Sequence, residues 1–67
     1  MKEQIKNNFS YHPPKEGQVE KFKDIRNEGL HFANLIDSNC PNSREKSLAL
    51  TKLEEAVMWA NASIARN

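Results

Sequence analysis

The chain has 67 residues, a formal net charge of +1, and ten basic against nine acidic side chains. A domain of this size buries only about 60% of the surface that its unfolded chain exposes, so it is marginally stable alone. The balanced charge is unlike the strongly basic surface of a protein that binds polymeric nucleic acid. With one cysteine, Cys40, the chain can form no internal disulfide. Its two histidines, His12 and His31, supply no metal-ligand set, which leaves association between copies as the means of stabilisation.

The hydropathy of the chain argues against a membrane location. No run of 18 apolar residues could form a transmembrane helix. The first eight residues contain no apolar stretch long enough for a signal peptide. A free thiol and no export signal predict a cytoplasmic protein.

Residues 1–14 are predicted to form an extended N-terminal arm. Phe9 and Tyr11 alternate along it, and Pro13 and Pro14 follow. A proline pushes the preceding residue toward extended backbone, which disfavours helix here. We expect the remainder, residues 15–67, to be a single helical hairpin domain.

The first helix is expected to run from Lys15 or Glu16 to Asp37 or Ser38, with Pro14 at or just before its first position. Pro41 then prevents the helix from continuing. Apolar residues and one glycine recur with helical spacing and predict its inward face: Val19, Phe22, Ile25, Gly29, Phe32, Ala33 and Ile36. Glycine costs a helix interior about 1 kcal/mol relative to alanine, so Gly29 indicates close approach of another helix or of a ligand.

The second helix is expected to continue to the end of the chain after a connection of about five residues. Asn42 can cap it, with Glu45 bonding back to the cap, and Ser43 is the competing cap. Alternating steps of three and four residues predict an inward seam of Leu50, Leu53, Val57, Ala60 and Ile64. The sequence therefore predicts an all-α fold, an antiparallel two-helix hairpin with an extended arm.

A second apolar stripe lies off this seam. It consists of Ala49, Ala56, Met58, Trp59 and Ala62. One partner helix cannot cover both stripes in so short a chain. We therefore predict a homo-oligomer, with binding sites built where copies meet.

Two groups of side chains could bind a ligand. Phe9 and Tyr11 precede a helix that carries Lys21, Lys23 and Arg26. An aromatic face with a cation is the minimum needed to hold a nucleotide. The same aromatics could instead anchor the arm to the hairpin. Basic side chains in the first turn of the second helix, Arg44 among them, could bind an anion or be solvated surface.

Arg66 complements the negative C-terminal helix dipole, which is a sufficient role by itself. No catalytic residues are predicted, because the chain lacks a nucleophile triad, a glycine-rich phosphate loop and a metal set. We also expect no cofactor.

The arm Phe9-Ser-Tyr11-His-Pro13 and the long string from Ser43 to Ala65 together resemble one known family. It is the phage anti-CBASS cyclic-nucleotide sponge family, whose hairpin domain is shared with Thoeris anti-defence sponges. The resemblance implies a hexamer that sequesters cyclic dinucleotides such as cGAMP and cyclic trinucleotides in the host bacterial cytoplasm. It also implies that the messengers are bound without cleavage.

The resemblance further implies two kinds of pocket between protomers. Carried onto this chain, the dinucleotide site would use the aromatic side chains of Phe9 and Tyr11. It would also use one basic side chain of the first helix, Arg26 or Lys23. The trinucleotide arginine would be Arg66, with Arg44 the other candidate, and we group Gly29 with that site.

Two other classes of function are compatible with the sequence. One is a structural or protein-binding helical oligomer, such as an antitoxin or assembly factor, with no nucleotide ligand. The other is a phosphodiesterase acting on the same messengers, which the missing metal ligands and general base disfavour.

Overall fold

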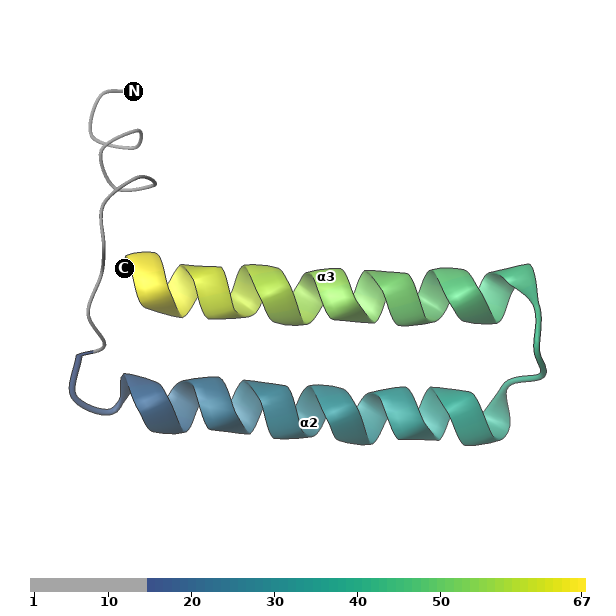
Figure 1. Ribbon diagram of the computed structural model, residues 1–67, viewed down its shortest axis with the longest axis horizontal. Coiled ribbons are helices and arrows are strands. Elements are labelled where there is room, and N and C mark those ends of the chain that lie inside the picture. The colour runs from purple at the N-terminus through teal and green to yellow at the C-terminus, as the bar shows by residue number, and fades with distance from the viewer. Residues whose placement is uncertain (1–14) are drawn as a thin grey trace, which may run out of the picture.

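The protein is described over residues 15–67 by a computed structural model, in which two long helices form an antiparallel hairpin (Figure 1). Helix α2 spans Gln18–Asn39 and helix α3 spans Arg44–Arg66. The two helices lie side by side along almost their full length. This confirms the predicted all-α hairpin, whereas the predicted arm, residues 1–14, lies outside the described residues.

Helix α2 begins later than the sequence indicated, at Gln18 rather than at Lys15 or Glu16. The residue before it, Gly17, has a φ of 84°, in the left-handed region that glycine enters without steric cost. The Gln18 N–H donates to the Lys15 carbonyl at 3.1 Å, which closes a turn ahead of the helix. The start of α2 is therefore set by the left-handed backbone of Gly17, whereas the sequence-based prediction had placed it from Pro14.

The connection between the helices is short and hydrogen-bonded at both ends. The Cys40 N–H donates to the Ile36 carbonyl at 3.0 Å and ends α2 just beyond the expected position. At the start of α3, the Ser43 hydroxyl accepts the Lys46 N–H at 3.1 Å. Ser43 is therefore the cap, and the expectation that Asn42 caps this helix is wrong. The Ser43 hydroxyl also donates to the Pro41 carbonyl, which fixes the side chain in its capping position.

The predicted seam of α3 is confirmed. It faces α2, and its members are half-buried: Leu50, Leu53, Val57, Ala60 and Ile64. On α2 the half-buried residues are Phe22, Ile25, Gly29, Ala33 and Ile36. Val19 and Phe32, which were expected on this inward face, are exposed instead. They lie at the margins of the stripe, and a single facing helix covers only its centre.

Gly29 of α2 and Val57 of α3 form a tight contact between the two helices. A Cβ atom added at Gly29 would lie 2.7 Å from Cγ2 of Val57, closer than real Cβ contacts allow. The absence of a side chain on Gly29 thus admits the valine. Of the two explanations for this glycine, close approach of a helix is the one that the hairpin displays.

The hairpin buries little of its apolar surface. Within residues 15–67 no apolar residue is fully buried, and Gln18 alone, 8% exposed, counts as interior. Met58 and Trp59 of the second stripe are 52% and 59% exposed. None of the helices in this part of the chain has the length and hydropathy needed to cross a membrane.

Candidate functional site

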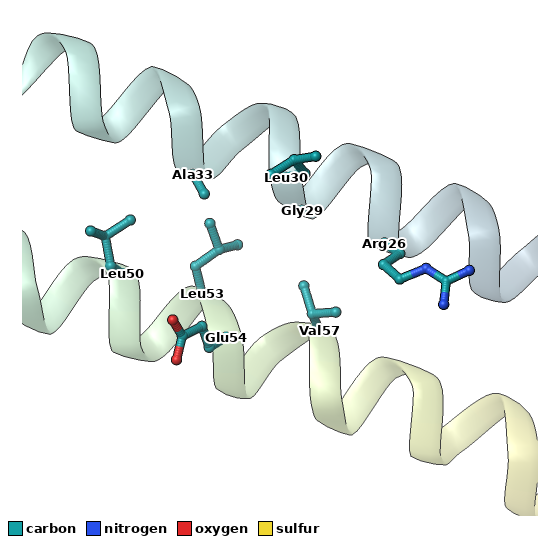
Figure 2. A pocket seen from close by; sticks show the side chains of 8 residues that line it. All are labelled: Arg26, Gly29, Leu30, Ala33, Leu50, Leu53, Glu54 and Val57. Atoms are coloured by element: carbon teal, nitrogen blue, oxygen red, sulfur yellow. The ribbon is translucent and has the colours of Figure 1, made fainter.

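An apolar groove runs beside the helix contact on the face that carries Arg26. Its volume is about 260 Å³. The residues that line it are Arg26, Gly29, Leu30, Ala33, Leu50, Leu53, Glu54 and Val57 (Figure 2). Its two charged residues come from different helices, and their side chains extend in opposite directions away from the apolar centre. We call this the Arg26 groove.

A second groove of about 260 Å³ lies beside the same contact and is called the Phe32 groove here. It shares Gly29, Leu53 and Val57 with the Arg26 groove, so the two flank one contact between the helices. Its other lining residues are Ile25, Glu28, Phe32, Ala56 and Ala60. Apolar surface therefore extends out on both sides of the seam.

The two basic candidates of α2 occur together. Lys23 and Arg26 are three residues apart, about 4.5 Å along the helix axis, and both are exposed. Residues with this spacing lie on neighbouring positions of one helix face, so both can reach the same anion. The aromatic candidates for this site, Phe9 and Tyr11, lie outside the described residues.

The trinucleotide candidates are not brought together within one hairpin. Arg44 and Arg66 are the first and last residues of α3, about 33 Å apart along its axis. Gly29 faces Val57, which is nine residues, or about 14 Å, before Arg66. All three could contribute to a single site only if different protomers supplied them.

Lys46, the second basic residue in the first turn of α3, is engaged with the end of α2. Its ammonium is 3.0 Å from the Asp37 carboxylate and also donates to the Asp37 carbonyl at 3.0 Å. A third bond, of 3.1 Å, reaches the Asn42 side chain, and the Lys46 side chain is only 10% exposed. Lys46 thus holds the connection against α2, whereas Arg44 is exposed at the surface.

The opposite, open end of the hairpin contains two polar residues of note, Gln18 and Asn61. The buried Gln18 side chain bridges the two helices: its Oε1 accepts the Lys15 N–H at 2.8 Å, and its Nε2 donates to the Ile64 carbonyl at 2.7 Å. Asn61, half-buried on α3, has a side-chain oxygen with no hydrogen-bond partner in the described hairpin. A buried acceptor without a donor is uncommon in a native structure. No local pattern identifies Gln18, because its bond to Ile64 joins positions 46 residues apart in the sequence.

The described residues contain no cluster of three or more histidine, cysteine, aspartate or glutamate side chains that could bind a metal ion. Cys40 is a free thiol, exposed in the connection between the helices.

Comparison with known proteins links this hairpin to one family. Residues 1–65 match the family described as Acb2/Tad1, hairpin domain. Arg66 lies one residue beyond the matched segment, whereas the other candidate residues lie within it. No curated protein and no solved structure gives a significant match. Since the match spans almost the whole sequence and agrees with the observed hairpin, the chain belongs to the Acb2/Tad1 hairpin-domain family of anti-CBASS and Thoeris anti-defence sponges.

Proposed function

We propose that this protein is a phage anti-defence sponge that sequesters cyclic dinucleotide and cyclic trinucleotide messengers of bacterial CBASS immunity. The observation that carries the proposal is the family match over residues 1–65, which includes the aromatic segment, all of α2 and all of α3 but its last residue. In this role the protein acts in the cytoplasm of the infected host. Removing the messenger keeps the downstream effector inactive without any chemical change to the nucleotide.

The functional unit in this proposal is a homo-oligomer, a hexamer by analogy with the family. The exposure of the large apolar side chains Leu30, Phe32, Met58 and Trp59 supports association, because covering them with another copy would remove apolar surface from water. Covering both grooves with neighbouring hairpins would remove that surface from water. The proposed domain organisation has residues 1–14 as an arm and residues 15–67 as the hairpin.

The proposed dinucleotide site combines Phe9 and Tyr11 with Lys23 and Arg26. An aromatic ring stacks on a nucleobase with about 1–3 kcal/mol per base, independently of base identity. Charge-assisted hydrogen bonds from the exposed side chains of Lys23 and Arg26 would bind the phosphates. The Arg26 groove supplies an apolar wall on the same face of the hairpin.

The proposed trinucleotide site uses Arg66, with Arg44 as the competing arginine and Gly29 as a point of close approach. Arg44 and Arg66 are alternatives at opposite ends of α3, and in this proposal the pocket forms where several protomers meet, as the resemblance to the family implies. A ligand with three phosphates fits such a junction, since each copy can contribute one cation. This arrangement predicts a trinucleotide pocket distinct from the dinucleotide pocket.

The arrangement of the carboxylates on α3 supports binding without cleavage. Hydrolysis of a phosphodiester needs an activated nucleophile and stabilisation of the charge that develops, commonly by metal ions. Glu54 and Glu55 are adjacent on α3 and point about 100° apart, a poor arrangement for a general acid and base. The test is recovery of intact nucleotide after the complex is denatured, with linear or monomeric products as the contrary result.

Calorimetric titration with 3′,3′-cGAMP tests the proposal directly. Capture has to compete with the effector, and nanomolar affinity corresponds to about −12 kcal/mol. We expect saturable heat with a fixed number of ligands per protomer. Linear pApG of the same composition is the matched control, since it offers the same bases and phosphates without the ring. Absence of heat with tens of micromolar cGAMP and with a cyclic trinucleotide would favour a structural or protein-binding oligomer.

A further inference from the structure

Two oppositely charged side chains border the Arg26 groove, Arg26 from α2 and Glu54 from α3. Both residues are exposed, and within residues 15–67 neither takes part in an ion pair. The two side chains extend to opposite sides of the apolar centre of the groove (Figure 2). The groove therefore presents an apolar middle, a cation on one side and an anion on the other.

The two charges are placed symmetrically about the contact between Gly29 and Val57, which borders the same groove. Arg26 and Glu54 each lie three residues before the member of this contact on their own helix, about 4.5 Å along its axis. Because the helices are antiparallel, the charges lie on opposite sides of the contact, about 9 Å apart along the helix axes. The contact is thus the midpoint between the cation and the anion.

This placement makes the face complementary to a second copy of itself. A two-fold axis that lies in the plane of the face, passes over the contact and runs perpendicular to the line between the charges exchanges their positions. Arg26 of each copy then meets Glu54 of the other, the reciprocal pattern of a two-fold interface between identical chains. Leu30, which is next to Gly29 and 63% exposed, lies close to this axis and would be covered by the second copy.

We propose that a second copy of the chain covers the Arg26 groove through a two-fold contact, with Arg26 of each copy paired to Glu54 of the other. The proposal rests on the homo-oligomer of the proposed function and assigns one of its contact surfaces. An anion lying across the groove would be repelled by Glu54, whereas a second copy brings an opposite charge to each side. The Arg26 guanidinium has five N–H donors, so this ion pair leaves donors for a ligand phosphate.

The test reverses the two charges and follows the mass of the assembly by analytical ultracentrifugation at fixed total concentration. Arg26→Glu and Glu54→Arg each place like charges at both ionic contacts, so we expect assembly to require about tenfold more protein. In an equimolar mixture of the two variants, a copy with two glutamates faces a copy with two arginines, and both contacts attract again. The mixture, and the double variant that carries both changes, should therefore regain the wild-type mass.

Two controls make the same charge changes away from the grooves. Lys21→Glu and Glu20→Arg lie at exposed positions of α2 that border neither the Arg26 groove nor the Phe32 groove, so neither should alter the mass. Should a single variant unfold when its assembly is lost, circular dichroism gives the same answer, because mixing the two variants should restore the helices.

The outcomes are distinguishable. A folded wild-type monomer at low micromolar concentration overturns the oligomer and this inference together. A wild-type oligomer whose mass is unchanged in both single variants overturns the pairing of Arg26 with Glu54 alone. Loss of assembly that neither mixing nor the double variant restores overturns it as well. Restoration by both, with unchanged controls, establishes the contact. None of these results depends on cGAMP, so a failure of nucleotide binding is a separate finding.

Discussion

Gly29 of α2 and Val57 of α3 fit together so closely that a single carbon atom added to the glycine would lie 2.7 Å from Cγ2 of the valine. Valine in a helix has one strongly preferred χ1 rotamer, so its methyl group cannot easily turn away. The contact lies between the Arg26 groove and the Phe32 groove, both of which it borders. It therefore sets how far apart the helices run where both grooves are formed.

Substituting Gly29 by alanine should lower the stability of the hairpin, even though alanine is the better helix former by about 1 kcal/mol. Overpacking of a tight contact typically costs about 1–3 kcal/mol, which outweighs that gain. The measurement is chemical denaturation at fixed protein concentration. In a Val57→Ala background the same substitution should become neutral or stabilising. A stabilising effect of Gly29→Ala in the wild-type background would contradict the packing argument.

Trp59 is the single tryptophan of the chain and is 59% exposed in the hairpin. It follows Val57 by two residues, about 200° around the helix, and so lies on the side of α3 away from α2. If copies cover this side, Trp59→Glu should shift the protein to lower mass in analytical ultracentrifugation. Ser47→Glu, an equal charge change at another exposed position of α3, is the control. A wild-type chain that stays folded and monomeric at low micromolar concentration would end the proposal of an oligomer.

Tyr11→Ala should weaken cyclic dinucleotide binding about 5- to 150-fold, the range that corresponds to the loss of one stacked base. Tyr11→Phe retains the ring and should bind nearly as well as wild type. The assembly should be unchanged in both variants, as measured by ultracentrifugation. If Tyr11→Ala dissociates the oligomer instead, the aromatic side chain anchors the arm and is not a ligand contact.

Arg26 and Lys23 are both exposed on α2, but only Arg26 lines the Arg26 groove. We therefore expect Arg26→Ala to weaken dinucleotide binding more than Lys23→Ala does. Arg26→Lys should recover part of the loss, because an ammonium provides the charge but not the planar fork of the guanidinium. Calorimetry in low and high salt measures both effects. A larger loss in Lys23→Ala would move the phosphate contact to that residue.

Arg66→Ala should weaken cyclic trinucleotide binding while leaving dinucleotide affinity unchanged. Arg44→Ala makes the same change at the other end of α3, about 33 Å away, and serves as its matched comparison. Titration of each variant with one ligand of each class identifies the arginine in use. Equal loss of both ligand classes in Arg66→Ala would count against two separate sites.

The seam of α3 could be predicted from sequence because it depends on helical periodicity alone, and residues from Leu50 to Ile64 occupy it as expected. The inward face of α2 was predicted too broadly. Val19 and Phe32 share its periodicity, but whether a marginal residue is covered depends on the width of the partner helix. Periodicity shows which way a side chain points, but it does not show how much of that side chain the neighbouring helix covers.

Contacts between distant segments could not be predicted from sequence. The bond from Gln18 to the Ile64 carbonyl and the ion pair between Lys46 and Asp37 both require the hairpin to be closed first. The choice of Ser43 over Asn42 as cap is a local matter, but both residues have suitable side chains, and the geometry of the connection decides between them. The candidate ligand residues came mainly from the family resemblance, since exposed arginines and lysines have no pattern of their own.

The apolar residues between the two helices are only half-buried in one hairpin. This affects how the amount of messenger bound depends on the concentration of the protein in the cell. Where folding depends on contacts with other copies, the free energy of unfolding rises with the logarithm of the total chain concentration. For the proposed assembly, a sparse population of chains would be largely unfolded and would capture almost nothing. Uptake would then begin above a threshold dose and rise steeply, rather than in proportion to the number of chains made.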